Sequence, residues 1–332
     1  MSFSSFELLD HSKSIVVFGR DGQVGKALQT CLKDLKVPII FLGRTDCDLS
    51  DEASITKILN QYQPQVIINA AAYTAVDKAE SEPQLAFAIN AHAPKVMAHY
   101  IANVSHGIFV HYSTDYVFAD TKKYAYLESD VTGPVDQLSV YGQSKLAGEQ
   151  AIEEIFNLAQ DSGHVSYKDK FSRYFILRTS WVYGDGGNFI RTMLRLAGER
   201  DQLKVVADQL GVPTSASWLA EVGIQIAGSR VESGIYNAVP DGEVSWHGLA
   251  VFAIETAASA GEGIEVKSEN ILPIPAKDYP LPAKRPYNSR MSNQKLKKAI
   301  SEMAFTGEYP HWQEQVEAYV KNYVSDSLKS WK

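Results

Sequence analysis

The chain has 332 residues, 45% of them hydrophobic and 21% charged, which is the composition of a globular protein with enough apolar material for one large domain or two associated ones. Its net charge of −7 and the lack of a long basic run argue against a nucleic-acid partner. Two cysteines exclude a disulfide scaffold, and no apolar run of the sequence approaches the roughly 20 residues that a membrane helix needs. Residues 1–13 are polar and do not resemble a signal peptide, so we expect a cytoplasmic protein without a membrane partner.

The first half of the chain alternates short apolar runs with longer segments of helical periodicity. Five runs are predicted to be strands, at residues 14–19, 38–43, 65–71, 108–114 and 174–182. Helices are predicted between them, at residues 25–36, from a cap at Ser50 or Asp51 to residue 62, at 83–103 and at 140–160. Strands that are apolar throughout are typical of a parallel sheet covered on both faces. The pattern therefore predicts an α/β fold with a doubly wound parallel sheet of the Rossmann type.

The second half of the chain is less regular. Strands are predicted at residues 203–206, 234–239 and 271–274, and helices near 215–227, 246–260 and 313–326. The proline-rich stretch at 273–286 is predicted to be mostly non-helical, because proline removes a donor and restricts its neighbour. We expect a Rossmann domain made of residues 1–184 plus about 214–260. The remainder, about 185–213 plus 261–332, is expected to form a smaller C-terminal substrate-binding lobe.

A glycine motif follows the first predicted strand directly. Residues 19–25 read G-x-x-G-x-x-G, and Gly19, Gly22 and Gly25 stand where a tight turn, close approach to a pyrophosphate and close helix–strand packing require glycine. The segment, which includes Gln23 and Val24, also opens the first helix, whose N-terminus attracts a phosphate. With these flanks the motif predicts a dinucleotide-binding loop rather than an ordinary strand–helix turn.

The end of the second predicted strand indicates which dinucleotide binds. An acidic residue there would bind the ribose 2′-OH, whereas Arg44 suits a 2′-phosphate, which favours NADPH with NADH as the alternative. The other interpretation of Arg44 is a solvated surface arginine. Asp48 and Leu49 are expected to close over the adenine. Small side chains follow the third strand, where a nicotinamide ribose would pass: Ala70, Ala71 and Ala72.

A tyrosine and a lysine are spaced for acid catalysis. Residues 141–145 read Y-x-x-x-K at the start of a predicted helix, which places Tyr141 and Lys145 on one helix face. A neighbouring ammonium lowers the pKa of a tyrosine, so the pair can give a proton to a developing alkoxide. Lys145 can also bind the nicotinamide ribose hydroxyls. Thr114 ends the fourth predicted strand, where its hydroxyl can bind a substrate oxygen.

Longer motifs resemble the dTDP-4-dehydrorhamnose reductase family of extended short-chain dehydrogenases/reductases. They are GxxGQVG at 19–25, INAAAYTAVDKAESEPQLAFAINA at 68–91, HYSTDYVF at 111–118, YGQSKLAGE at 141–149, RTSWVYG at 178–184, NFIRTMLRLA at 188–197 and RPYNSRM at 285–291. The resemblance runs from about residue 14 to about residue 319. It implies NAD(P)H-dependent reduction of the C4 keto group of dTDP-4-dehydro-L-rhamnose to dTDP-L-rhamnose, with Thr114, Tyr141 and Lys145 as the catalytic residues.

The resemblance also implies a sugar–nucleotide site in the matching motifs, with residues Thr114, Asp115, Tyr116, Trp181, Asn188 and Arg191. Asp77, Lys78 and Glu80 match a family stretch but receive no chemistry from it. Residues 167–173 lengthen the connection before the fifth strand and are expected to be a surface elaboration.

Some family members are dimers bridged by Mg²⁺ held on glutamates. The matching positions here are Ala27, Gln313 and Glu199, of which only Glu199 is an acid. Because Mg²⁺ prefers carboxylate oxygens, we expect no metal site and either a monomer or a metal-independent homodimer.

Two other functions fit parts of this pattern. The beta regulatory subunit of methionine adenosyltransferase resembles the same family and serves a partner without catalysis, and nucleotide-sugar epimerases or dehydratases share the loop and the Y-x-x-x-K motif. Intact Tyr141 and Lys145 favour catalysis over the first alternative. RTSWVYG and the short chain after it favour the reductase over the second.

Overall fold

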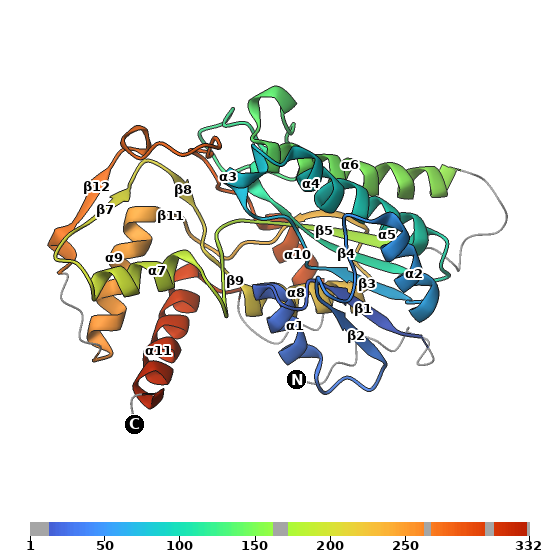
Figure 1. The fold of residues 1–332 in the computed structure, drawn as a ribbon, viewed down its shortest axis with the longest axis horizontal. Coiled ribbons are helices and arrows are strands. Elements are labelled where there is room, and N and C mark those ends of the chain that lie inside the picture. The colour runs from blue at the N-terminus through green and yellow to red at the C-terminus, as the bar shows by residue number, and fades with distance from the viewer. Residues whose placement is uncertain (1–12, 162–171, 262–266, 303–308, 331–332) are drawn as a thin grey trace.

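The computed structural model describes residues 13–161, 172–261, 267–302 and 309–330. A six-stranded sheet forms its centre, with the order β10-β5-β4-β3-β1-β2 and only parallel pairings (Figure 1). The strands are β1 (Ile15–Phe18), β2 (Ile39–Leu42), β3 (Val66–Asn69), β4 (Ile108–Thr114), β5 (Arg173–Thr179) and β10 (Gly234–Asn237). This order turns back between β1 and β3, which is the doubly wound topology, and the predicted fold class is confirmed.

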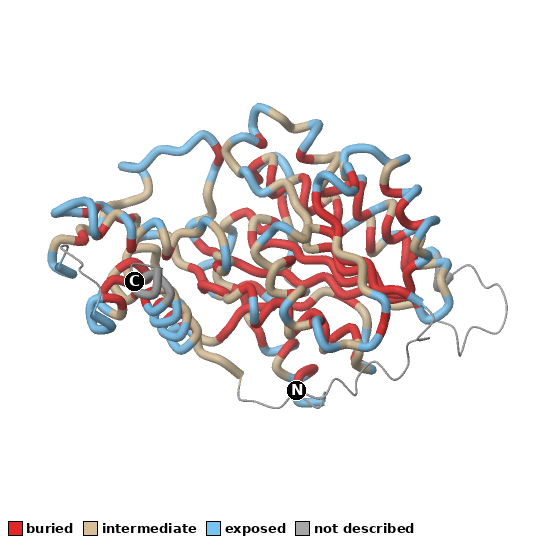
Figure 2. Tube along the Cα trace, turned by 60° about the horizontal axis from the view of Figure 1, so that its bottom comes forward, coloured by how far each residue is buried: buried red, intermediate tan, exposed pale blue. Residues whose placement is uncertain are grey.

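The strands are apolar throughout because both faces of the sheet are covered. Alternate residues point to opposite faces: Ile15 and Val17 pack into one buried cluster, and Val16 and Phe18 into another. Helices α1 (Gln23–Leu32), α8 (Ala216–Gly228) and α10 (Gln294–Glu302) contribute to the first cluster. The second contains side chains of α2 (Glu52–Tyr62), α5 (Ala93–Ala102) and α6 (Val140–Asp161). Figure 2 shows the sheet as the most continuous buried part of the molecule.

The helix predicted at 83–103 has an irregular centre. It consists of α4 (Pro83–Phe87), a π-helical turn (Ala88–His92) and α5, and the short α3 (Val76–Ala79) precedes it. Pro94 lies in the first turn of α5 and lacks an N–H group, and the wider turn is formed just before it. The turn carries the buried Asn90 towards α6, where a Cβ atom on Gly148 would lie 2.2 Å from the Asn90 carbonyl oxygen. Glycine at position 148 therefore permits this close helix contact.

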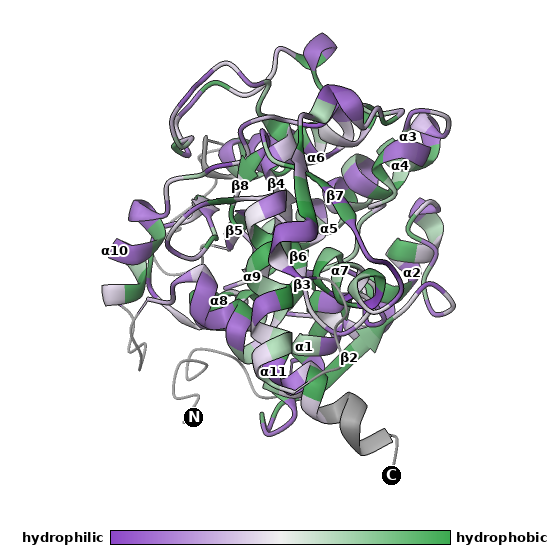
Figure 3. Ribbon diagram, turned by 90° about the vertical axis from the view of Figure 1, so that its left-hand side faces the viewer, coloured by the Kyte–Doolittle hydropathy of each residue, from purple (hydrophilic) through white to green (hydrophobic). Residues whose placement is uncertain are grey.

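A second group of elements lies beside the sheet, on the left of Figure 1 and facing the viewer in Figure 3. Its helices are α7 (Phe189–Ala197), α9 (Trp246–Ser259) and α11 (Trp312–Ser330), and its strand pairs are β7 (Leu203–Val206) with β12 (Ile271–Ile274) and β8 (Leu210–Gly211) with β11 (Val244–Ser245). Leu194, Leu249 and Val316 share a buried cluster that is separate from the two sheet clusters. Helix α9 packs against α7 and α11, whereas α10 packs against β10 of the sheet.

The fifth predicted strand is broken in the structure. β5 ends at Thr179, and a separate β6 (Val182–Tyr183) pairs with β9 (Thr214–Ser215). Between them Ser180 Oγ donates to the Val212 carbonyl at 2.8 Å, and Trp181 has a φ of +49°, which no extended strand allows. The expectation of one strand over 174–182 was wrong because contacts with residues 212–215 redirect the chain.

Two helices, α7 and α10, were not predicted. The proline-rich stretch is mostly non-helical as predicted, with a single 3₁₀ turn (Ala276–Asp278). The expected elaboration at 167–173 falls almost wholly outside the described residues. Among the helices that the structure describes, none is both long and apolar enough to cross a membrane.

Candidate active site

The glycine loop joins β1 to α1 with the close contacts that its spacing predicts. Gly19 has a φ of +94°, and a Cβ atom there would lie 2.6 Å from the carbonyl carbon of Ala70. A Cβ atom on Gly25 would lie 1.9 Å from the Gly19 carbonyl oxygen, so neither position accepts a side chain. Gly22 precedes α1 and provides no side-chain cap, which leaves backbone N–H groups at this helix end for a ligand.

Arg44 is exposed, and among the described residues it has no ion-pair partner. Arg20, in the glycine loop, also lies beside the end of β2, since a Cβ atom on Gly43 would be 2.8 Å from an Arg20 guanidinium nitrogen. Arg20 is held by Asp21 at 3.1 Å and by Asp46 at 2.7 Å. Arg20 is thus a second basic residue at this strand end, and our prediction did not include it.

The other expected cofactor residues surround the same loop. Ala70 begins the chain after β3, directly against Gly19, and is followed by Ala71 and Ala72. The Asp48 carboxylate accepts from the Ser50 N–H at 2.8 Å and from its hydroxyl at 2.7 Å, so local bonds use one of its oxygens. Two residues of the first turn of α1 differ in setting. Val24 packs against the sheet core, whereas Gln23 Oε1 is buried and has no partner among the described residues.

Thr114, Tyr141 and Lys145 lie together at the carboxyl end of β4. Thr114 is the last residue of that strand, and its side chain forms a hydrogen bond with Tyr141, in the first turn of α6. Burial raises the pKa of Tyr141 to about 12, and the side-chain contact with Thr114 opposes the rise. The Tyr116 ring packs edge-on against the Tyr141 ring, with centroids 5.4 Å apart. The tyrosine hydroxyl is therefore protonated at neutral pH and held against a strand end.

Lys145 does not lower the pKa of Tyr141 as we expected. Its Nζ atom donates to the Tyr112 carbonyl at 2.6 Å and lies 3.1 Å from Nε2 of His111, so its contacts are with β4. The side chain is fully buried, and burial lowers the pKa of Lys145 to about 8 against the opposing charge of Glu149. The expectation failed because the spacing fixes a shared helix face but not the direction in which a long side chain turns.

A buried ion pair lies behind the lysine. Glu149, one turn after Lys145, accepts from Arg178 of β5 in a two-pronged contact with distances of 2.7, 3.0 and 3.2 Å. Both side chains are almost completely buried, at 1% and 3% exposure. Such a planar contact is the strongest form of ion pair, and it fixes α6 against the sheet. Sequence reasoning missed this pair because 29 residues separate its members.

Three acidic or amide residues of the 68–91 motif also have structural partners. Glu80 Oε1 accepts from the Val140 N–H at 2.9 Å and so binds the start of α6, while Lys78 pairs with Glu82. Asn90 accepts from the Tyr73 N–H at 2.8 Å and donates to Ser144 Oγ at 3.0 Å, next to Lys145 in the chain. These contacts hold α6, which carries Tyr141 and Lys145, against the segment at residues 73–90. No local sequence pattern predicts them.

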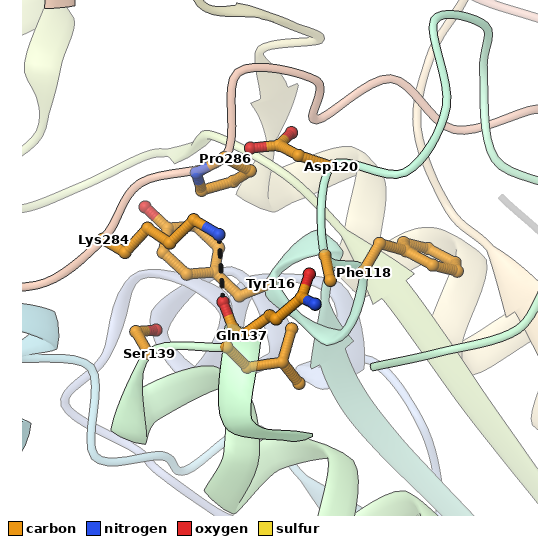
Figure 4. Close-up of a pocket in the computed structure, with 9 residues that line it drawn as sticks. Tyr116, Phe118, Asp120, Gln137, Ser139, Lys284 and Pro286 are labelled. Carbon is orange, nitrogen blue, oxygen red and sulfur yellow. Dashed lines mark hydrogen bonds between the residues drawn. The ribbon is translucent and has the colours of Figure 1, made fainter. Parts of the chain in front are cut away.

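The segment with the RPYNSRM motif crosses beside Tyr116. Asp77 binds Arg285 at 2.7 Å, and the Asp120 carboxylate accepts from the N–H groups of Tyr287 and Asn288 at 2.9 and 2.8 Å. Figure 4 shows the pocket that results, with the Lys284 Nζ atom donating to the Gln137 carbonyl. Its lining is Tyr116, Phe118, Ala119, Asp120, Gln137, Leu138, Ser139, Lys284 and Pro286.

The remaining expected substrate residues have mixed settings. Asp115 is 2% exposed and accepts from Thr114 Oγ1 at 3.1 Å, and burial raises its pKa to about 7. Trp181 stacks on Trp246 with ring centroids 3.6 Å apart. Asn188 caps α7 by accepting from the Arg191 N–H at 3.0 Å, and Arg191 donates to the Tyr319 hydroxyl at 2.7 Å. Asn188 and Arg191 thus have structural bonds within the lobe, and their contact with a substrate stays a prediction.

The parallel sheet, the glycine loop and the Thr114–Tyr141–Lys145 group define an oxidoreductase of the short-chain dehydrogenase/reductase class. The family model described as RmlD substrate binding domain matches residues 13–325, and the chain belongs to this family. It is 40% identical over 308 residues to the dTDP-4-dehydrorhamnose reductase of Escherichia coli (strain K12), which covers 90% of this chain and 94% of that protein.

Solved structures agree with the family assignment. A dTDP-4-dehydrorhamnose reductase from Clostridium acetobutylicum superposes with a TM-score of 0.79 at 34% identity, over 93% of this chain and 99% of that one. The enzyme from Bacillus anthracis, solved in complex with NADP, gives a TM-score of 0.77 at 30% identity over 93% and 98% of the two chains.

Proposed function

We propose that the chain is an NADPH-dependent dTDP-4-dehydrorhamnose reductase, which converts dTDP-4-dehydro-L-rhamnose to dTDP-L-rhamnose. The observation that carries the proposal is the buried side chain of Tyr141, which contacts Thr114 at the carboxyl end of β4. The glycine loop follows β1 at the same end of the parallel sheet. Family membership and the 40% identity to the Escherichia coli enzyme support the choice of substrate.

The residues of the glycine loop fit a dinucleotide. Gly19 and Gly25 keep the backbone open to close approach, and the uncapped start of α1 offers N–H groups to a pyrophosphate. NADPH, with NADH as the alternative, would be held by this loop, by Arg44, by Asp48 and Leu49, and by Ala70, Ala71 and Ala72. When bound, it supplies a hydride for the C4 carbon of the sugar.

The chain's own residues complete the reduction. Tyr141 donates its hydroxyl proton to the C4 oxygen as negative charge develops there, and Thr114 Oγ1 turns its proton from Asp115 to the same oxygen and orients it. The ammonium form of Lys145 binds the ribose hydroxyls, while the contact with Thr114 favours the phenolate that remains on Tyr141. Burial keeps water away from this group, so that the charges act in a medium of low polarity.

The substrate is proposed to lie between the sheet and the second group of elements. Tyr116, Asp115, Trp181, Asn188 and Arg191 are the candidate contacts for the sugar and its diphosphate. We also propose a cytoplasmic enzyme with a Rossmann domain and a C-terminal lobe. The packing favours counting α9 with the lobe and α10 with the Rossmann domain, which moves the boundaries from those that the sequence predicts.

The activity is tested by adding the 4-keto sugar nucleotide to the protein with NADPH and following both cofactor and product. Stoichiometric NADPH oxidation with formation of dTDP-L-rhamnose is expected. Conversion of the sugar without net NADPH oxidation would indicate an epimerase or dehydratase instead. No turnover despite nucleotide binding would favour the regulatory subunit.

Cofactor preference provides a separate prediction. Arg44→Asp removes a cation from the expected 2′-phosphate position and adds a repelling anion, so the ratio of kcat/KM for NADPH to that for NADH should fall by about tenfold or more. Steady-state kinetics with both cofactors measures this ratio. Arg200→Asp makes the same charge change at another exposed position and should leave the ratio unaltered. A wild-type protein that strongly prefers NADH would show that Arg44 is only a surface charge.

Metal independence is the next prediction. Ala27 has no ligand atom, Gln313 has a neutral side chain, and Glu199 is already paired with Arg195 at 2.7 Å, so these positions do not fit Mg²⁺. We expect EDTA to leave activity and solution mass unchanged, whether the protein is a monomer or a homodimer. Light scattering with and without EDTA measures the mass. A dimer that dissociates on chelation would show that other carboxylates bind a bridging ion.

A further inference from the structure

His111 is a buried titratable residue that the proposed reaction does not use. It is 1% exposed, lies in β4 and pairs in register with Asn69 of β3. Each ring nitrogen faces a polar side chain: Nδ1 lies 3.1 Å from Nδ2 of Asn69, and Nε2 lies 3.1 Å from Nζ of Lys145. The imidazole therefore connects the sheet interior to the catalytic lysine.

The contacts of Asn69 decide which ring nitrogen carries the proton. Asn69 Oδ1 accepts a hydrogen bond from the Ala71 N–H at 3.1 Å, and a backbone N–H group can only donate. The opposite end of the same amide, Nδ2, is therefore the donor that faces His111. Because Nδ1 must accept this bond, a neutral ring carries its proton on Nε2. Complete burial holds the pKa of His111 well below its usual value, which keeps the ring neutral.

An Nε2–H group consequently points at Lys145. An ammonium group has three donors and no lone pair, so it would face this N–H as donor against donor. A neutral amine accepts from Nε2–H with its lone pair and still donates to the Tyr112 carbonyl. We infer that His111, with its tautomer fixed by Asn69, favours the uncharged form of Lys145 and is a positioning residue that sets the protonation state of the catalytic lysine before NADPH binds.

Other titratable groups near Lys145 also affect its pKa. Glu149 lies one turn later on α6 and favours the ammonium form, but Arg178 of β5 neutralises it through the buried ion pair. Tyr141, one turn earlier on α6, is protonated and uncharged at neutral pH. His111 comes from β4, and Asp115 follows that strand, where burial raises its pKa to about 7 and its charge acts on Tyr141. Burial of the amine works in the same direction as the His111 donor.

The inference, which rests on the proposed NADPH site, has a consequence for binding. Ribose hydroxyls are bound best by the ammonium form, so NADPH binding above the pKa of Lys145 requires uptake of a proton. The affinity for NADPH is therefore highest below the pKa of Lys145 and falls as the pH rises through that pKa. For a pKa of about 8, the dissociation constant of NADPH should be about tenfold higher at roughly pH 9 than at pH 7.

Changing the tautomer tests the inference without any nucleotide. In Asn69→Asp one carboxylate oxygen can keep the Ala71 bond while the other accepts from Nδ1–H, which leaves Nε2 free to accept from the ammonium. The titration of Lys145, followed by NMR in protein labelled with carbon-13 at the lysine Cε, should then move upward by at least about one pH unit, towards the ordinary lysine value. His111→Phe removes the Nε2–H group and should move it in the same direction. Asn288→Asp adds the same charge at another buried asparagine and should not move it.

A Lys145 signal that titrates at the same pH in the wild type, Asn69→Asp and His111→Phe would overturn the inference, as would a downward shift in both variants. The pH dependence of NADPH affinity is a second readout, and it should flatten between pH 7 and 9 in Asn69→Asp. The proposed function fails independently if the wild type binds no NADPH at any pH, because the lysine titration is made without the cofactor.

Discussion

Tyr141→Phe should lower kcat for reduction of the 4-keto sugar nucleotide by roughly 10²- to 10⁴-fold while leaving NADPH affinity nearly unchanged. The substitution removes the only proton that Tyr141 offers the C4 oxygen, but it keeps the ring that packs against Tyr116. The loss belongs in kcat, because the proton moves in the transition state rather than during binding. Steady-state kinetics and a separate NADPH titration measure the two effects.

Tyr236→Phe is the matched control for this variant. Tyr236 is a buried tyrosine of β10 whose hydroxyl donates to the Glu232 carbonyl, so the same deletion removes a hydrogen bond at another place. It should cost about 1 kcal/mol of stability and leave kcat unchanged. Near-normal turnover of Tyr141→Phe would assign the proton to another group and contradict the site.

Glu149→Ala should lower the free energy of unfolding by about 3–5 kcal/mol, because it leaves the guanidinium of Arg178 buried without its carboxylate. Urea unfolding followed by circular dichroism measures the loss. Glu199→Ala breaks an exposed ion pair between Arg195 of α7 and Glu199, just after that helix, and should cost only about 0.3–0.5 kcal/mol.

A double substitution distinguishes the cost of leaving one buried charge unpaired from the net contribution of the ion pair. Replacing both Glu149 and Arg178 by methionine removes both charges and fills a similar volume, so it should restore most of the stability that Glu149→Ala loses. If Glu149→Ala is no more costly than Glu199→Ala, the arginine reaches water and the ion pair is not the attachment of α6 described above.

The sequence predicted the strands and helices around the sheet well, because their signals are local. Asp51, one of the two predicted caps, caps α2 by accepting from the Ala53 N–H at 3.0 Å, and the helix predicted at 25–36 is present as α1, which ends at Leu32. The break after β5 was not predictable in this way. It depends on Ser180 and Trp181 meeting residues about 30 positions later, which a local apolar run cannot reveal.

In the candidate site, too, the features that depend on local sequence were predicted and those that depend on distant contacts were not. Thr114 and Tyr141 were predicted from strand-end and helix-start positions, and their hydrogen bond agrees with that placement, although their roles await the kinetic test. The contacts of Lys145 with His111 and of Glu80 with Val140 join residues 34 and 60 positions apart. Such pairs are formed by the tertiary fold, so the sequence alone gave no reason to select them.

The position of β10 has a consequence for synthesis on the ribosome. This strand covers the edge of β5, yet it follows β5 in the chain only after α7, β7 and α8. Until residues 234–237 have been translated and have left the exit tunnel, β5 presents a free parallel edge of apolar residues. The nascent chain therefore exposes this edge to pairing with other chains during the interval in which the stretch between β5 and β10 is translated.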